Sequence, residues 1–228
     1  MNIKKMCVSV VAMTALAVSL GSAARAQDSV PKMQVFGGYS FGTNNCFGGC
    51  FDPGLHGYTA AFTYNFNRHL GLEANFSGHN GVVTIDESLP QGTNNGFIDK
   101  VGQDLYVYTF GPRLSVPVGN FSLFSHILVG ATHVHAVSTE QCLQATGGGT
   151  CFNPFNDHVT GNGFAGKFGG GVDWNHRRWG IRILEVDYIR GQIFTTTTCA
   201  SCNTSKFDGS GNAFELATGV TFNFGGMK

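Results

Sequence analysis

The sequence predicts an all-β protein, an eight-stranded antiparallel up-and-down transmembrane β-barrel with short periplasmic turns and long extracellular loops. Three observations predict it. Alternating apolar and polar stretches of about ten residues, the length a tilted strand needs to cross a bilayer, recur along the chain. The connections between these stretches are alternately short and long. The chain is also rich in Gly (33) and Phe (20) but only 12% charged, which favours strands with an aromatic exterior over a helical enzyme.

Residues 1–26 have the features of a secretory signal peptide. Lys4 and Lys5 precede an apolar run at 8–20, and small residues lead to Ala26. We therefore expect cleavage before Gln27 and a single outer-membrane barrel domain over residues 27–228. Retention of the apolar run as a membrane anchor is the alternative, although the run is short for a transmembrane helix.

Removal of the signal peptide would leave a mildly acidic chain. The whole sequence has a formal net charge of zero, and Lys4, Lys5 and Arg25 would leave with the peptide. This charge argues against nucleic acid as a partner. Beyond the signal peptide no run of about 20 apolar residues remains, so we expect no transmembrane helix in the mature chain.

The first four strands are expected at about 33–41, 58–66, 70–77 and 105–116. The second has the clearest alternation, with Tyr58, Phe62 and Phe66 on one face and Thr59 and Thr63 on the other. In each strand the face with the larger apolar residues is expected to meet lipid. Pro112 interrupts the fourth strand, and we expect a bulge there because proline cannot donate a hydrogen bond to its neighbour.

The last four strands are expected at about 121–135, 161–174, 179–194 and 213–224. The sixth and seventh form a hairpin around the basic turn at 175–178. In the seventh strand Arg182 and Glu185 are three positions apart, so strict alternation cannot turn both side chains inward. Either a bulge lies near Ile183 and Leu184, or one of the two charged residues faces the rim.

The connections support the same topology. Three short ones lie near 67–69, 117–120 and 175–178, and four long ones near 42–57, 78–104, 136–162 and 195–212. The long connections are polar and rich in Gly, Asn and Thr. Because outer-membrane barrels have short periplasmic turns and longer extracellular loops, the long connections are expected at the cell surface.

The last predicted strand carries a family resemblance. Its alternating Val220, Phe222 and Phe224 resemble the aromatic C-terminal signal by which bacterial outer-membrane barrels are recognised for insertion. The segments at 110–114 (FGPRL) and 187–190 (DYIR) resemble strand patterns of the OmpA-like eight-stranded outer-membrane barrel family. The resemblance covers the barrel alone. It implies a location in the bacterial outer membrane and contact with the barrel-insertion machinery, but not the peptidoglycan-binding role of the larger relatives.

Charged residues gather at the positions expected to point into the barrel. An eight-stranded barrel is just wide enough for side chains to fill, so buried charges must be paired. One interpretation is a polar core that closes the barrel, and the other is a narrow ion path that opens when the pairs rearrange. The expected interior network consists of Glu73, Arg113, His126, Lys167, Asp173, Arg182, Glu185, Asp187 and Glu215.

Six cysteines follow the signal peptide, all within the predicted long connections. In an oxidising compartment their spacing favours disulfides within loops, with bridges between loops as the alternative. The C-x-x-C spacing of the last pair also occurs in redox and metal sites. Neither a βαβ pattern nor a second close Cys or His pair accompanies it here, so we predict no metal site and no cofactor. The expected pairs are Cys46 with Cys50, Cys142 with Cys151, and Cys199 with Cys202.

Two further groups of residues invite a chemical interpretation. His133 and His135 lie on one strand face and could bind a metal, although histidines at a membrane interface are common without one. Ser125 and His126 invite comparison with lipid-modifying outer-membrane enzymes, which use Ser and His. Adjacent residues in a strand point to opposite faces, so this pair cannot cooperate easily, and we predict no catalytic residues.

The sequence therefore predicts an outer-membrane barrel with a structural or surface-interaction role through disulfide-stapled loops. A small low-conductance pore is the alternative, and a lipid-modifying enzyme is a weaker one. A soluble lipocalin-like binder would need an apolar interior, the reverse of the Glu73/Phe76 and Asp173/Trp174 arrangement. The expected partners are outer-membrane lipid, the insertion machinery and a surface ligand whose identity the sequence does not give.

Overall fold

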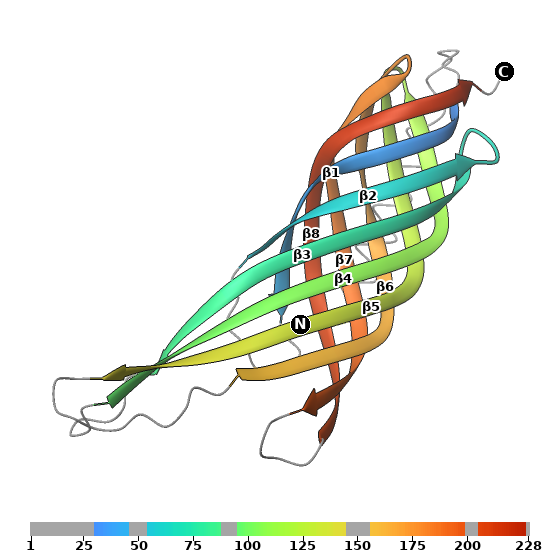
Figure 1. Ribbon diagram of the computed structural model, residues 1–228. Coiled ribbons are helices and arrows are strands. Elements are labelled where there is room, and N and C mark those ends of the chain that lie inside the picture. The colour runs from blue at the N-terminus through green and yellow to red at the C-terminus, as the bar shows by residue number, and fades with distance from the viewer. Residues whose placement is uncertain (1–29, 46–53, 88–94, 145–155, 199–204, 227–228) are drawn as a thin grey trace, which may run out of the picture.

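Eight antiparallel strands close into one barrel (Figure 1). The computed structural model describes residues 30–45, 54–87, 95–144, 156–198 and 205–226. Each strand pairs with the next along the chain, and the last pairs with the first, Pro31 lying opposite Gly226. The predicted fold class is confirmed. The strands are β1 Pro31–Asn45, β2 Leu55–Asn65, β3 Leu70–Glu87, β4 Asn95–Val118, β5 Phe121–Gln144, β6 Asn156–His176, β7 Trp179–Thr198 and β8 Ser205–Gly226.

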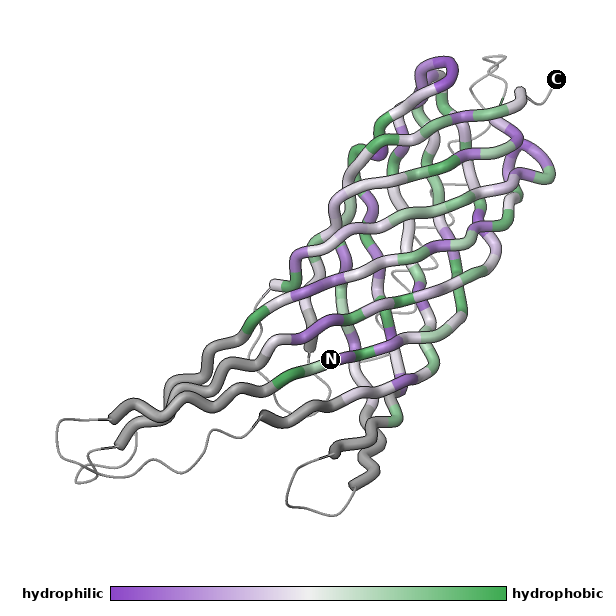
Figure 2. Tube along the Cα trace, viewed as in Figure 1, coloured by the Kyte–Doolittle hydropathy of each residue, from purple (hydrophilic) through white to green (hydrophobic). Residues whose placement is uncertain are grey.

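The exterior of the barrel is apolar and the interior is largely polar. In β2, Tyr58 and Phe62 are exposed, whereas Thr59 and Thr63 are buried. Figure 2 shows the same alternation of hydropathy along the described strands. Burial of polar residues inside a closed sheet whose outer face is apolar is the arrangement of a transmembrane barrel of the bacterial outer membrane. A lipocalin-like binder has the opposite arrangement and is excluded.

No helix among the described residues is long and apolar enough to cross a membrane.

The three predicted short turns are confirmed. The connections from β2 to β3, β4 to β5 and β6 to β7 span 66–69, 119–120 and 177–178. In the first, Asn67 Oδ1 accepts hydrogen bonds from the backbone N–H groups of His69 and Leu70, both at 2.8 Å. In the other two, Gly119 and Arg177 adopt positive φ values of 60° and 53°, as tight two-residue hairpins require.

An aromatic group marks the membrane interface at the turn end. Trp174 and Trp179 flank the β6–β7 turn and meet edge to face, with ring centroids 5.5 Å apart, while His176 stacks on Trp174. Aromatic girdles are characteristic of both interfaces of such barrels. Because the short connections of such barrels are periplasmic, this end of the barrel is the periplasmic one and the opposite ends of the strands face the cell exterior.

The strands are longer than the sequence predicted. Much of the chain expected to form long loops is strand: β4 and β5 remain paired out to Asn95 and Gln144. The prediction was wrong because it counted only lipid-facing alternation, and a strand that has left the bilayer no longer needs an apolar face. The β1–β2 pair ends earlier, at Gly42 and Leu55. The wall is therefore taller on the β3–β5 side, where Figure 1 shows the strands extending together beyond the barrel.

The two predicted bulges have different outcomes. The bulge near Ile183 and Leu184 is confirmed, because the β7–β8 register shifts between Arg182 and Glu185. The prediction of a bulge at Pro112 is wrong. Phe110 pairs with Val129 and Arg113 with His126, so the β4–β5 register is the same on both sides of the proline. Only the two residue pairs between them are missing from the β4–β5 pairing. Proline is tolerated because it removes one hydrogen bond from a strand that has many others.

Several predictions fall outside the described residues. The signal peptide does, as do Cys46, Cys50, Cys151, Cys199 and Cys202. Cys142 belongs to β5, opposite Phe97, but the position of its side chain is not described. The loop disulfides therefore stay a prediction.

Candidate functional site

The structure places all nine predicted interior residues inside the barrel, each no more than 2% exposed. They come from β3, β4, β5, β6, β7 and β8, and strand alternation turns each of them inward. The bulge in β7 adds one residue between Arg182 and Glu185, so both side chains point inward while Ile183 (50% exposed) and Leu184 (46%) both face outward. Because of this single register shift, both charged side chains lie in the barrel interior.

Arg182 occupies the centre of one half of this ionic layer. Its Nε donates to Asp173 Oδ1 and its Nη1 to Glu185 Oε2, both at 2.8 Å. Arg113 completes the group, since its Nη2 donates to the other oxygen of Asp173 at 2.8 Å and its Nη1 to Glu73 Oε2 at 2.9 Å. Two guanidinium groups thus bridge three carboxylates, which provides the pairing that buried charges require.

The other half of the layer centres on Asp187. His126 Nε2 lies 2.8 Å from Asp187 Oδ1, and Lys167 Nζ lies 2.9 Å from Asp187 Oδ2. Lys167 also donates to Glu215 Oε2 at 3.2 Å and to Asn75 Oδ1 at 3.1 Å. The layer therefore extends continuously across the barrel from β3 to β8.

Two inward-facing aromatic residues, which the sequence reasoning missed, support the arginines. The guanidinium carbon of Arg182 lies 4.0 Å from the ring centroid of Phe36 and 4.4 Å from that of Phe124, and that of Arg113 lies 3.9 Å from Phe124. Both rings are buried. These cation–π contacts fill the space beside the ion pairs that water would otherwise enter.

Uncharged side chains cover the ionic layer at both ends. On the periplasmic side Gln34, Asn175 and Asn223 are joined by two hydrogen bonds of 3.1 Å. On the extracellular side an apolar cluster spans the interior, another feature absent from the sequence prediction; it consists of Leu55, Leu105, Val107, Val134 and Ala165. Level with this cluster, where His79 pairs with Leu105, Ser40 Oγ lies 2.9 Å from His79 Nε2, and both residues are buried.

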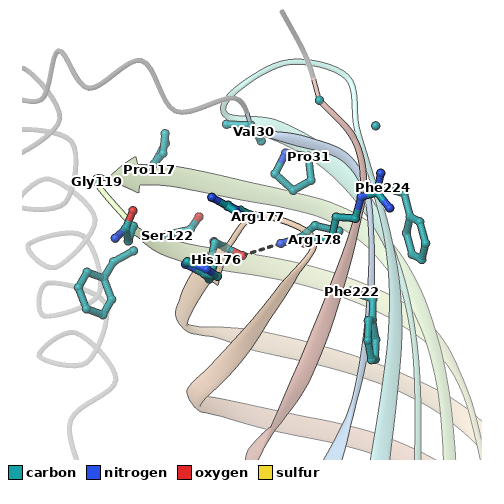
Figure 3. Close-up of a pocket in the computed structure, with 16 residues that line it drawn as sticks. Val30, Pro31, Pro117, Gly119, Ser122, His176, Arg177, Arg178, Phe222 and Phe224 are labelled. Atoms are coloured by element: carbon teal, nitrogen blue, oxygen red, sulfur yellow. Dashed lines mark hydrogen bonds between the residues drawn. The ribbon is translucent and has the colours of Figure 1, made fainter.

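A pocket of about 910 Å³ opens at the periplasmic mouth (Figure 3). Its wall combines His176 at the end of β6, Arg177 and Arg178 in the β6–β7 turn, the β4–β5 turn, and the ends of β1 and β8. Asn175 and Asn223 also line it, so the pocket ends at the amide groups that cover the ionic layer. The pocket is therefore a basic depression at the barrel mouth that ends at these amide groups.

The remaining residues with possible chemistry contact other side chains or lie on different faces of the strand. His133 stacks on Tyr106 and lies 2.7 Å from Asn162 Oδ1, while His135 lies 3.2 Å from Thr160 Oγ1. Ser125 is exposed on the outer face, whereas His126 is buried inside. The residues proposed for the insertion signal, Val220, Phe222 and Phe224, are exposed on the outer face of β8.

No protein-family model and no curated protein matches the chain. Several solved structures are similar to it. Ail, the attachment invasion locus protein of Yersinia pestis, is 15% identical over 85% of this chain and 99% of its own, with a TM-score of 0.44. OprG, an outer membrane protein of Pseudomonas aeruginosa, is 12% identical over 86% and 97%, with a TM-score of 0.47. The outer membrane protein AlkL is 14% identical over 89% and 94%, with a TM-score of 0.43.

Proposed function

We propose that this protein is an integral outer-membrane barrel with a closed interior, and that it acts through its extracellular surface. One observation carries the proposal: the ionic layer crosses the whole interior, and amide and apolar side chains cover it at its two ends. A barrel filled in this way anchors whatever its loops present. Its working surface is then the rim formed by the extended strands and the connections between them.

Loops stapled by disulfides are part of the same proposal. Short disulfide loops lower the conformational freedom that a loop loses when it binds a partner. Support comes from the sequence, in which the cysteines cluster in pairs within the predicted long connections. The partner belongs to the surface of another cell, a host or a phage.

Planar-bilayer conductance of the purified, folded barrel tests the closed interior. We expect no discrete channel steps, because opening a path would break several buried ion pairs, each costing about 3–5 kcal/mol. Steps of constant size in wild-type protein would contradict the proposal and favour the small low-conductance pore. The measurement is repeated with a thiol reductant, and steps that appear only then would show that the loops gate a path.

The insertion machinery is the second proposed partner, and its contact is the outer face of β8. Substitution of both Phe222 and Phe224 by Ser is expected to lower the amount of protein in the outer membrane several-fold. The matched control is Phe214→Ser with Leu216→Ser, two exposed apolar residues of the same strand farther from its end. Quantitative immunoblots of outer-membrane fractions give the answer. Equal losses for the two double variants would show that only lipid-facing apolarity matters.

A lipid-modifying enzyme finds no support in the described residues. The Ser125–His126 pair that raised this alternative is divided between the two faces of β5. The Ser40–His79 pair lies in the barrel interior, which lipid acyl chains do not reach.

A further inference from the structure

We propose that the ionic layer contains a divalent transition-metal site formed by Glu73, His126 and Glu185. These residues come from β3, β5 and β7, so the closure of the barrel brings them together. One nitrogen of His126 and one oxygen of each glutamate all lie within 4.8 Å of one another. All three side chains are almost completely buried. Imidazole nitrogen and carboxylate oxygen are ligands that Zn²⁺ and similar ions use in proteins.

In each glutamate, the carboxylate oxygen that does not bind an arginine faces His126. Arg113 holds Glu73 by Oε2 and Arg182 holds Glu185 by Oε2, while both Oε1 atoms have no hydrogen-bond partner among the described residues. His126 Nδ1 has none in that part of the chain either, although it lies 3.1 Å from Glu73 Oε1. Glu73 Oε1 and His126 Nδ1 therefore face each other at ion-pair distance, whereas Glu185 Oε1 has His126 Nε2 only at 3.9 Å. Buried polar atoms are nearly always satisfied, so the poorly partnered Glu185 Oε1 is the atom that a bound cation would satisfy.

The opposite nitrogen of His126 is already fixed by a carboxylate. Its Nε2 lies 2.8 Å from Asp187 Oδ1, and Lys167 in turn holds Asp187. In metal sites a ligating histidine usually donates its other N–H to a carboxylate, which orients the ring and leaves the first nitrogen with a free lone pair. Asp187 would act in this way as a positioning residue for His126.

The formal charge of the layer is compatible with a bound cation. Among the described interior residues the carboxylates are Glu73, Asp173, Glu185, Asp187 and Glu215, and the permanent cations are Arg113, Lys167 and Arg182. With neutral histidines, five negative and three positive charges leave a net charge of −2, and a proton on His126, which lies between Asp187 Oδ1 and Glu73 Oε1, would reduce it to −1. A divalent cation neutralises this charge without requiring His126 to be protonated, and a net charge is costly in a low-dielectric interior.

The distances require only a local contraction on binding. Metal–ligand bonds of about 2.0–2.2 Å place neighbouring ligand atoms about 3–3.5 Å apart. Glu73 Oε1 and His126 Nδ1 already have this spacing, at 3.1 Å. Glu185 Oε1 lies 3.9 Å from His126 Nε2, the nitrogen that faces Asp187, so the Glu185 carboxylate must turn toward Nδ1 to share an ion with it. Rotation about the terminal bond of a glutamate allows this movement.

Metal retention by the folded protein tests the proposal. The protein is purified in detergent, unfolded with a chelator to remove metal, refolded with Zn²⁺ and desalted, and its zinc content is measured by mass spectrometry. Wild-type barrel is expected to retain about one Zn²⁺ per chain, and Glu185→Gln and His126→Gln to bind it at least about tenfold more weakly. The gel mobility shift of folded barrels on heating identifies the folded fraction of each variant.

Glu215→Gln is the matched control. It removes the same charge from the same buried layer, but Glu215 does not belong to the trio of possible ligands. It is therefore expected to retain zinc as the wild type does. Equal losses in Glu185→Gln and Glu215→Gln would show an effect of charge alone, and unchanged retention in Glu185→Gln would place the zinc elsewhere. Either result overturns the proposal.

The wild-type protein provides a test that requires no variant to fold. Co²⁺ in place of Zn²⁺ gives visible absorption whose intensity is high when few nitrogen and oxygen ligands surround the ion. A folded wild-type barrel with neither this absorption nor retained zinc overturns the proposal. The result is independent of the proposed surface role, which the conductance and insertion experiments test separately.

Discussion

Replacement of Arg182 by Met is expected to destabilise the barrel by about 3–5 kcal/mol, since it leaves buried carboxylates without their cation. Arg182 is fully buried and binds Asp173 and Glu185 at 2.8 Å each. Methionine keeps most of the aliphatic volume against Phe36 and Phe124 but provides no charge. The loss therefore comes mainly from the uncompensated charges rather than from a cavity.

Urea unfolding in phospholipid vesicles, followed by tryptophan fluorescence, gives the free energy of unfolding for this comparison. Arg178→Met is the control, because Arg178 lies exposed in the β6–β7 turn, and its effect should remain within about 0.5 kcal/mol. Adding Glu185→Gln to Arg182→Met should restore part of the loss, since one unpaired charge disappears. If Arg182→Met and Arg178→Met had the same effect, the ionic layer would contribute nothing measurable to stability.

The topology and the inward residues were predictable because both follow from local alternation. Each strand had to turn one face to lipid, which predicted that charged residues such as Glu73, Arg113 and Lys167 lie on the other face. The conflict between Arg182 and Glu185, three positions apart, was enough to locate the bulge at Ile183 and Leu184. Here a violation of the pattern gave as much information as the pattern itself.

The pairing of the charges was not predictable, because it depends on the stagger between strands. Arg113 meets Glu73 across the β3–β4 pair and Asp173 across the barrel interior, and no sequence spacing encodes the second contact. The trio of Glu73, His126 and Glu185 comes from three strands that are not neighbours in the sheet. Spacing rules for metal ligands detect sites within one local segment and give no signal here.

Inward aromatic residues were missed for a different reason. Phe36 and Phe124 are the same residue type as the many phenylalanines on the lipid face. Only their position in the alternation of inward and outward residues distinguishes them. Each alternates with outward-facing neighbours, Val35 in β1 and Leu123 in β5. Strict application of the period of two assigns both inward, so the signal was present, but the expectation of a polar interior obscured it.

Ile127→Arg is expected to destabilise the barrel by about 2–4 kcal/mol, because it places a charge near the middle of the bilayer. Ile127 is exposed on the outer face (60%), six residues beyond the start of β5 at the periplasmic turn. At about 3.4 Å per residue and a tilt of about 40°, it lies about 15 Å into an apolar band about 25 Å tall. No described ion pair or hydrogen bond of the interior layer uses its side chain.

Ile181→Arg is the matched control. It exchanges the same two residue types at a similar outward position (40% exposed), but Ile181 lies only two residues beyond the start of β7 at Trp179. A charge at this depth reaches the interface and should cost about 0–1 kcal/mol. Unfolding in vesicles measures both variants. The difference between them depends on depth in lipid alone, because both side chains point away from the interior. Equal and small effects would mean that water, not lipid, surrounds the outer face, and the membrane assignment of the whole exterior would then be wrong.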